Sequence, residues 1–249
     1  MPPRQSRKRR PATRPRNARP TGRDRPSRVL AVFAHPDDEI GCVGTLANHV
    51  RNGDEVLLVW TTYGENASHF NGVGPKQVAR VREGHGRRVG RLIGCATRFL
   101  GFPDTAVPWD RDSTLKLAAV YSEFRPDVVI TWDDYSQHPD HRATAKLALD
   151  AITLARIPNV VGDAHREEIT FLQYYSPYSP KSVIHVDITP SIETVAKVLK
   201  VYADFYGWPW RPDDLKALRA VTGREAHVQY AERFNTNLRF PKARELLEI

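Results

Sequence analysis

The sequence predicts a three-layer α/β/α fold built around a mostly parallel β-sheet. Residues 29–34 form a continuous apolar run, and residues 55–61 and 127–132 are mostly apolar, as expected of strands that are covered on both faces. Segments in which apolar residues recur every three or four positions separate these runs along the chain. Strands that alternate with helices of this length form parallel sheets with helices on both faces.

The predicted elements follow one another from residue 29 onward. The first strand leads into a helix at 39–52, which Gly53 ends, and the second strand leads through a Gly- and Asn-rich loop at 64–74 into a helix at 76–93. The remaining elements are a strand at 98–100, a helix at 113–124, the strand at 127–132, a helix at 141–157, strands at 168–175 and 183–188, and helices at 192–206 and 213–234. This order indicates a single Rossmann-like domain over residues 29–249.

Residues 1–28 differ from the rest of the chain. They contain eleven Lys or Arg against one acid, Asp24, and six of the 19 prolines. The net charge of +8 belongs to this segment, because 26 basic and 28 acidic residues follow Arg28. A segment so poor in apolar side chains cannot offset the entropy lost on ordering, so we expect a disordered basic tail. It is either a solvated extension or an arm that contacts nucleic acid through counterion release.

Several classes of protein are excluded by composition. No run of about 18 apolar residues occurs, so no membrane span is expected. Cys42 and Cys95 are too few for a disulfide framework or a cysteine-based zinc site. Two cysteines suit a reducing compartment, and we expect a cytoplasmic protein.

Two polar clusters follow strands of the predicted sheet. Residues 35–39 (HPDDE) come directly after the first strand, and residues 133–141 (DDYSQHPDH) come directly after the strand at 127–132. Ligands of open α/β sheets bind at the carboxyl ends of the strands. If these two strands are neighbours, the clusters share one crevice. Either cluster alone is equally consistent with an ordinary helix start, where acidic residues are favoured.

The residue types in these clusters are those of a catalytic metal site. Zinc takes imidazole and carboxylate ligands and keeps a water in its open position. His35 and Asp38 can reach one ion from a strand-to-helix turn, and either His138 or His141 supplies the third ligand. Asp37 is then left over as a general base for a water whose pKa the metal lowers to about 7. The remaining histidine can stabilise an oxyanion.

The paired motifs AHPDDE and HPDH resemble those of the zinc-dependent deacetylases of the PIG-L (LmbE-like) family, which remove acetyl from N-acetylglucosaminyl groups or cleave related amides. The resemblance covers residues 29–160. It implies that His35, Asp38 and His141 bind the metal, that Asp37 is the base and that His138 stabilises the oxyanion. It also implies that Asp140 orients a histidine ligand. Iron(II) is an alternative to zinc for the same ligands.

The resemblance extends to three substrate contacts. It implies that Glu65 meets sugar hydroxyls, that Arg82 contacts substrate and that Asp104 lines the pocket. Arg82 is equally consistent with a solvated helix face, and Asp104 with an ordinary turn residue. The C-terminal half is expected to shape one wall of the pocket. We assign no role to its aromatic residues, because aromatic side chains most often pack in a core.

We therefore predict a zinc hydrolase that deacetylates an N-acetylglucosamine-type amide. One alternative is an amidase that acts on a thiol conjugate or a secondary-metabolite sugar. The alternative from another class is a nucleic-acid-binding protein that uses residues 1–28 and retains a vestigial metal site.

Overall fold

The computed structural model describes residues 25–237. Most of the predicted tail, residues 1–24, therefore lies outside the described residues. Its last residues contact the domain, since the Arg25 guanidinium donates to both carboxylate oxygens of Asp127 at 2.9 Å and the Ser27 amide donates to Asp54. The first strand begins directly after them, at Arg28.

The described residues form one seven-stranded sheet in the order β3-β2-β1-β4-β5-β7-β6. The strands are β1 (Arg28–Phe33), β2 (Glu55–Trp60), β3 (Ala96–Phe99), β4 (Val128–Thr131), β5 (Thr170–Tyr174), β6 (Ser182–Asp187) and β7 (Ala231–Asn237). The first five are parallel, and β7 runs antiparallel to both β5 and β6. The predicted mostly parallel sheet is thus confirmed.

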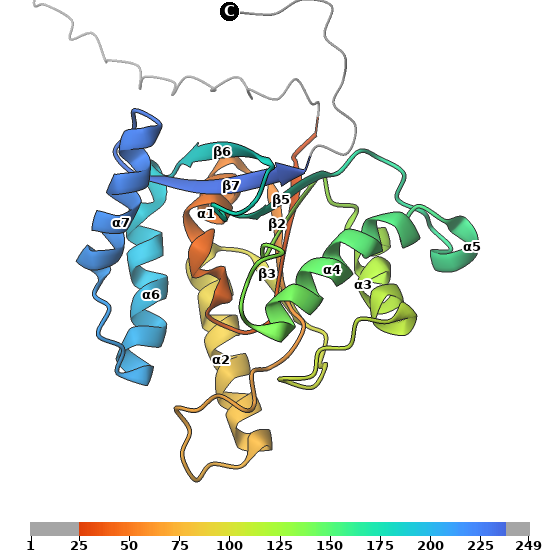
Figure 1. The fold of residues 1–249 in the computed structure, drawn as a ribbon, viewed down its shortest axis with the longest axis horizontal. Helices are drawn as coiled ribbons and strands as arrows, with labels where there is room; N and C mark the ends of the chain where they lie inside the picture. The colour runs from red at the N-terminus through yellow and green to blue at the C-terminus, as the bar shows by residue number, and fades with distance from the viewer. Residues whose placement is uncertain (1–24, 238–249) are drawn as a thin grey trace, which may run out of the picture.

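Helices cover both faces of this sheet (Figure 1). The α-helices are α1 (Val43–Asn52), α2 (Pro75–Ile93), α3 (Arg111–Phe124), α4 (Pro139–Leu154), α5 (Pro158–Val161), α6 (Ile192–Tyr206) and α7 (Pro212–Glu225), with short 3-10 helices η1 (Asp38–Gly41) and η2 (Thr189–Ser191). The layer on one face holds α1, α2 and α6, with α7 outside α6, and the layer on the other holds α3 and α4. The predicted three-layer architecture is confirmed.

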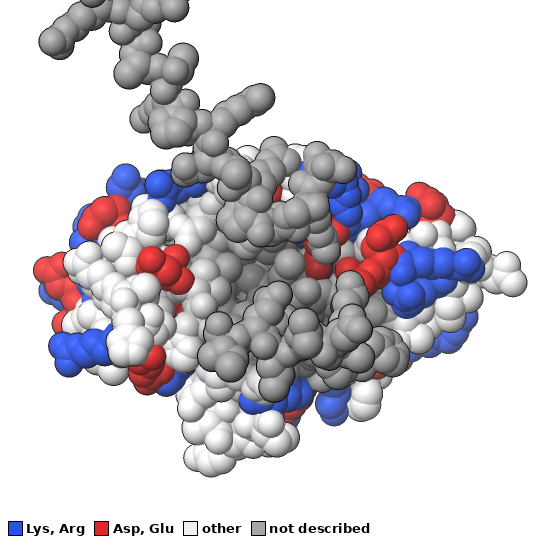
Figure 2. Space-filling model, turned by 90° about the horizontal axis from the view of Figure 1, so that it is seen from above, with Lys and Arg blue, Asp and Glu red and all other residues white. Residues whose placement is uncertain are grey.

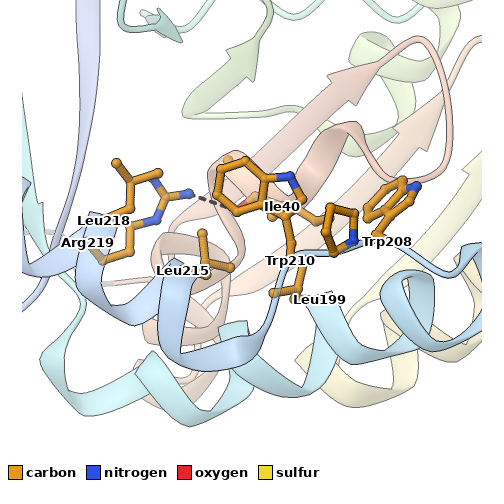
Figure 3. Close-up of a pocket in the computed structure, with 9 residues that line it drawn as sticks. Ile40, Leu199, Trp208, Trp210, Leu215, Leu218 and Arg219 are labelled. Carbon is orange, nitrogen blue, oxygen red and sulfur yellow. Dashed lines mark hydrogen bonds between the residues drawn. The ribbon is translucent and has the colours of Figure 1, made fainter.

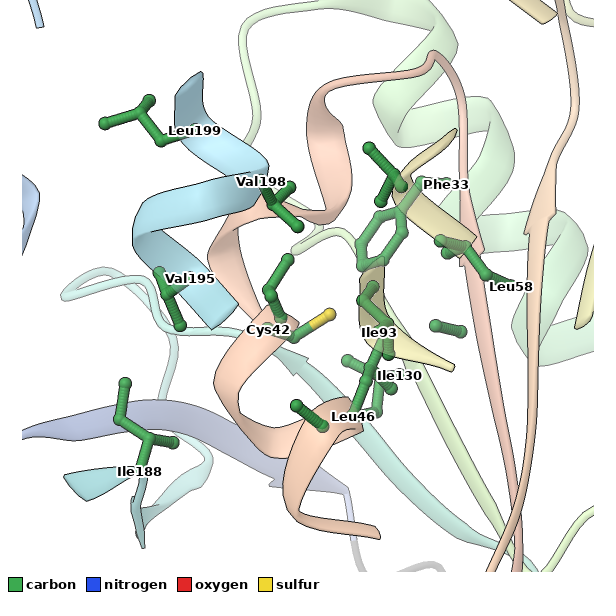
Figure 4. Packing of buried hydrophobic residues seen from close by; sticks show 14 of the residues in the cluster. Phe33, Cys42, Leu46, Leu58, Ile93, Ile130, Ile188, Val195, Val198 and Leu199 are labelled. Carbon is green, nitrogen blue, oxygen red and sulfur yellow. The ribbon is translucent and has the colours of Figure 1, made fainter. Parts of the chain in front are cut away.

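Two hydrophobic cores, one on each face, follow from the alternation of side chains along the central strands. In β1, Val29, Ala31 and Phe33 belong to the core under α1, α2 and α6, whereas Leu30 and Val32 belong to the core under α3 and α4. Figure 4 shows the first core, where Phe33 of the strand lies near side chains of several helices. Because residues 29–33 of β1 are completely buried, the turn that follows them has a rigid base.

The prediction of one helix over 213–234 is wrong in its second half. Helix α7 ends at Glu225, and the chain turns back to form β7 in the gap between β5 and β6. Gly223 allows the close approach that this turn needs, since a Cβ there would lie 2.7 Å from the carbonyl oxygens of Val228 and Gln229. Strand pairing along both edges of β7 prevails over the helical pattern read from the sequence.

The surface of the described residues carries both signs of charge. On the face seen in Figure 2, Lys and Arg side chains lie interspersed with Asp and Glu side chains. Among residues 25–237, no helix is both long and apolar enough to cross a lipid bilayer.

Candidate active site

The two polar clusters meet at the edge of the sheet where the strand order reverses. From the central β1 the chain passes to β2 and β3 on one side, then returns to β4 on the other, so the crevice lies between β1 and β4. These strands are hydrogen-bonded neighbours, as the prediction required. The ring of His35 consequently lies 4.8 Å from that of His138 and 5.3 Å from that of His141, centroid to centroid.

Asp38 is held so that one carboxylate oxygen remains free for a ligand. Its Oδ2 accepts the backbone amides of Ala34 and His35, at 3.0 and 2.9 Å, and the Trp132 indole N–H at 2.8 Å. Its Oδ1 faces His141 Nε2 at 3.4 Å. Burial raises the pKa of Asp38, but hydrogen bonds with His141 and His35 outweigh that effect and lower it well below its usual range. Asp38 is therefore an ionised carboxylate in the crevice.

His35 is surrounded by carboxylates. Its Nε2 lies 3.0 Å from Asp104 Oδ1 and 3.2 Å from Asp140 Oδ2, and its Nδ1 lies 3.6 Å from Asp38 Oδ2. Burial alone would lower the pKa of His35, but these three carboxylates raise it to about 12. Without a metal, His35 is therefore protonated on both ring nitrogens. A metal would displace the proton of Nδ1, the nitrogen nearer Asp38, while the Nε2–H keeps its carboxylate partners.

The two histidines of α4 are oriented differently. His141 stacks on Trp132 with ring centroids 3.9 Å apart, and its Nδ1 is hydrogen-bonded to the Ser136 hydroxyl at 2.9 Å, so Nε2 points toward Asp38. His138 Nδ1 instead accepts the backbone N–H of Asp140 at 3.2 Å. The proton of a neutral His138 therefore lies on Nε2, which makes it a hydrogen-bond donor. Burial lowers the pKa of His138 and favours this neutral form.

This donor set fits a divalent metal. Ligands about 2.0–2.1 Å from a tetrahedral zinc lie roughly 3.3 Å from one another, and Asp38 Oδ1 and His141 Nε2 are 3.4 Å apart. Ring nitrogens of His35, His138 and His141 all lie within 4.8 Å of one another. Three carboxylates around His35 also leave an excess of negative charge that a cation would balance. His35, Asp38 and His141 could hold the ion, while Asp140 and Asp104 orient His35.

Asp37 lies beside this group, in an unusual backbone conformation. Its φ is 116°, in the left-handed region, and its amide donates to Glu39 Oε2 at 2.9 Å. Burial raises the pKa of the Asp37 carboxyl to about 6, although the Arg82 guanidinium opposes the rise. A carboxyl with such a pKa can accept and return a proton near neutral pH.

Arg82 does not lie on a solvated helix face. It is 3% exposed, and its guanidinium donates to the carbonyl oxygens of Tyr63 and Pro36, to Asp37 Oδ2 at 3.3 Å and to the Tyr206 hydroxyl. Two of these four contacts, those with Pro36 and Asp37, hold the charge of Arg82 against the residues that follow β1.

The two remaining predicted contacts form one turn beside the cavity. Asp104 accepts the Asn66 amide at 2.7 Å, and Glu65 Oε1 accepts the Asp104 amide at 2.9 Å. Glu65 thus braces Asp104 rather than lining the cavity among the described residues. The cavity, about 440 Å³ in volume, is lined by His35, Asp37, Asp38, Gly64, Asn66, Ala67, Ser68, His69, Arg82, Asp104, Thr105, His138 and His141. Such a volume accommodates a small polar ligand.

A second hollow has no such chemistry. It lies between α6, α7 and η1, and Figure 3 shows Trp208, Trp210 and Leu215 along it, with the Arg219 guanidinium donating to the Ile40 carbonyl. Most of its lining is apolar, and it lacks the clustered histidines and carboxylates of the first cavity. The cavity at the β1 and β4 ends is therefore the candidate active site.

Sequence reasoning gave no role to several residues that hold this site. Two of these residues, Glu39 and Ser136, lie within the predicted clusters. The other two, Tyr202 and Tyr206, lie far along the chain. Of these residues, only Glu39 has a local sign of its role in the sequence, namely an acidic side chain next to the predicted ligands. The tyrosines could be found only from the fold.

Comparisons with known proteins find similarity to deacetylases and to an amidase. Residues 30–152 match the family model described as PIG-L, GlcNAc-PI de-N-acetylase. The chain is 26% identical over 219 residues to a diacetylchitobiose deacetylase of Thermococcus kodakarensis, covering 82% of this chain and 81% of that protein. It is 29% identical over 186 residues to a mycothiol S-conjugate amidase of Streptomyces coelicolor, covering 64% of this chain and 60% of that protein.

A solved structure shows the same architecture. The N,N'-diacetylchitobiose deacetylase of Pyrococcus horikoshii, complexed with an inhibitor, has a TM-score of 0.74 and is 26% identical, covering 85% of this chain and 84% of that chain. The motifs that suggested the resemblance, HPDDE and HPDH, both lie within the matched residues. The resemblance to the PIG-L (LmbE-like) deacetylases that the motifs indicated is thus confirmed, with the family match at residues 30–152.

Proposed function

We propose that this protein is a zinc-dependent hydrolase that removes acetyl from an N-acetylglucosamine-type amide. The observation that carries the proposal is that Asp38 Oδ1 and His141 Nε2, from segments 103 positions apart, lie 3.4 Å apart beside the unliganded carboxylate of Asp37. A site kept only for structure does not need that additional, partly exposed carboxylate.

His35, Asp38 and His141 would hold the zinc ion. When bound there, zinc polarises the acetyl carbonyl and makes hydroxide available from water near neutral pH. Asp140 accepts the His35 Nε2–H and two backbone amides, those of Thr105 and Val107, which keeps His35 in a fixed orientation.

The chain's own residues supply the proton transfers. Asp37 accepts a proton from the water that attacks the acetyl carbon, and the His138 Nε2–H donates to the oxygen that becomes negative. Asp37 then returns its proton to the amine nitrogen as the C–N bond breaks. The products are acetate and the free amino sugar.

Arg82 and Asp104 line the same cavity and are proposed to contact the sugar. Arg82 also holds the Asp37 carboxylate, so its contact with substrate is coupled to the base. Glu65 is proposed to act on substrate binding by fixing Asp104. Asp104 is in turn hydrogen-bonded to His35, so the sugar-binding side and the metal-binding side share one residue.

The test is acetate release from a panel of acetylated sugars by zinc-loaded protein. Incubation with N-acetylglucosamine and with N,N'-diacetylchitobiose should yield acetate and primary amine in equal amounts. Reloading the metal-free protein with iron(II) under anaerobic conditions decides between the two metals by their relative turnover. Failure to release acetate from every acetylated sugar of the panel, at full metal occupancy, would contradict the proposal.

A second candidate activity is hydrolysis of the amide of a mycothiol S-conjugate. The 29% identity to an amidase that bears this name favours it. Both substrates at equal concentration distinguish the two activities by their kcat/KM values. The nucleic-acid alternative stays a prediction, since it rests on a tail of which residues 1–24 lie outside the described part of the chain.

A further inference from the structure

Helix α6 presents two tyrosines, Tyr202 and Tyr206, to the residues that hold Asp37. They are one helical turn apart, and their rings are parallel, with centroids 6.2 Å apart and an interplanar angle of 4°. The hydroxyl of each tyrosine is hydrogen-bonded to a different partner of Asp37. The helix lies beyond residues 30–152, which match the family model.

Tyr202 acts on the backbone of Asp37. Its hydroxyl donates to Glu39 Oε1 at 2.7 Å, and the other oxygen of that carboxylate accepts the Asp37 amide at 2.9 Å. The Trp60 indole N–H also donates to Glu39 Oε2, at 3.2 Å. Tyr202, Glu39 and Trp60 are all fully buried. This chain of bonds pins the peptide of Asp37, whose φ of 116° is costly for a residue with a side chain.

Tyr206 acts on the side chain of Asp37. The Arg82 guanidinium donates through one nitrogen to the Tyr206 hydroxyl at 2.8 Å, and through another to Pro36 O and Asp37 Oδ2. Without the tyrosine hydroxyl, the guanidinium keeps its bonds to Tyr63, Pro36 and Asp37 but loses the partner of Nη1. Tyr206 itself is absent from the described lining of the cavity.

We propose that Tyr202 and Tyr206 are positioning residues that hold Asp37 in its reactive geometry, Tyr202 through Glu39 on the main chain and Tyr206 through Arg82 on the carboxylate. This inference rests on the proposed role of Asp37 as the base. It assigns to α6 a part in the reaction that differs from shaping a pocket wall. Neither tyrosine touches the reacting atoms.

The test uses the variants Tyr202→Phe and Tyr206→Phe in the full, zinc-loaded chain, because each removes only a hydroxyl and keeps the ring. Two quantities are measured: kcat and KM for an acetylated sugar that the wild type hydrolyses, and the hydrogen-exchange rate of the Asp37 amide without substrate. Each variant should lower kcat about tenfold with KM within about twofold, since each loses one buried hydrogen bond to a residue that holds Asp37. Exchange at Asp37 should be about tenfold faster in Tyr202→Phe and unchanged in Tyr206→Phe.

Tyr121→Phe is the matched control. The Tyr121 hydroxyl is also fully buried and donates to the Ala148 carbonyl at 2.9 Å, but it lies on α3, on the opposite face of the sheet. This variant should lose similar stability and keep the wild-type kcat and the wild-type exchange rate at Asp37. An equal loss of kcat in all three variants would show that α6 acts only through general stability, and would overturn the inference.

The inference and the proposed function fail in different ways. If Asp37→Ala is inactive but Tyr202→Phe and Tyr206→Phe retain the wild-type kcat, Asp37 is the base and the tyrosines do not position it. If the wild type releases no acetate from any sugar of the panel, the proposed function fails. Hydrogen exchange of the Asp37 amide then still tests whether Tyr202 holds the main chain at Asp37. Unchanged exchange at Asp37 in Tyr202→Phe then refutes the hold on the main chain, and faster exchange supports it.

Discussion

Replacing Asp37 by alanine and by glycine separates its chemical role from its backbone conformation. Both variants remove the carboxylate that is proposed to carry the proton from water to the amine. Both leave His35, Asp38 and His141 in place. We expect kcat to fall by about 10²–10⁴-fold in each, the usual contribution of a general base, with zinc content still near one per chain.

The two variants should differ in their free energy of unfolding, and the glycine variant should be the more stable of the two. At φ 116° a residue with a Cβ is disfavoured by about 1–2 kcal/mol, which glycine avoids. Glycine loses about 0.5–1 kcal/mol more than alanine through the entropy of the unfolded chain. The net expectation is that Asp37→Gly is more stable than Asp37→Ala by about 0.5–1 kcal/mol, whereas glycine is the less stable residue at ordinary positions.

The assays are urea unfolding of the two proteins at equal zinc occupancy, acetate release, and metal analysis. Because the variants share the loss of the Arg82 contact and of the buried charge, their difference in unfolding free energy isolates the backbone. An Asp37→Ala protein as stable as Asp37→Gly would refute the strained geometry. An Asp37→Ala protein with wild-type kcat would refute the assignment of the base.

Three further predictions test the neighbourhood of the site. His141→Ala should lose zinc, whereas His138→Ala should keep it and lose about 10²–10³-fold in kcat, and metal analysis showing the reverse would exchange their roles. Gly86→Ala should lower the free energy of unfolding, measured by urea titration, by about 1–3 kcal/mol, because the new Cβ would lie 2.8 Å from two aromatic rings. Gly84→Ala lies on the same helix, where a Cβ would have no atom within 4 Å. It should raise the free energy of unfolding by up to about 1 kcal/mol in the same titration. Glu232→Ala should lower it by about 3 kcal/mol, since the buried carboxylate accepts two amides and a hydroxyl at the start of α1, and a thermal melt like that of wild type would contradict this.

The parts of this protein that the sequence predicted are those whose signals are local. A run such as residues 29–34 is apolar throughout because β1 is buried on both faces, and the HPDDE that follows it marks the carboxyl end of that strand. The second cluster follows β4 in the same way, so adjacency of two strands was enough to bring the histidines together. Parallel sheets place such ends at one edge, which is why the site could be expected before the fold was known.

The strand β7 could not be predicted, because several of its buried positions are polar. Glu232 and Asn235 are inaccessible to solvent, and each is satisfied by a distant partner: Glu232 by the amides that begin α1, and Asn235 by the Ser176 amide. In the sequence such residues look like a solvated helix face, so α7 was extended through them. A buried polar residue is recognisable only once its partner is known.

The same property explains why the C-terminal half was underestimated. The sequence predicts only a pocket wall for this half. In the structure it supplies the Tyr202 hydroxyl, which is hydrogen-bonded to Glu39, and the Tyr206 hydroxyl, which is hydrogen-bonded to Arg82. It also supplies Glu232, which accepts an amide at the start of α1. The two tyrosines contact the residues that hold Asp37, whereas Glu232 contacts Gly44 and Thr45 at the start of α1. A strained turn persists only where its surroundings over-determine it, and here the contacts of Glu39 and Arg82 with Asp37 are extended by the two hydroxyls from α6. The matched residues 30–152 contain the groups proposed to react, and we expect the geometry of Asp37 to depend in part on α6, which lies outside the match.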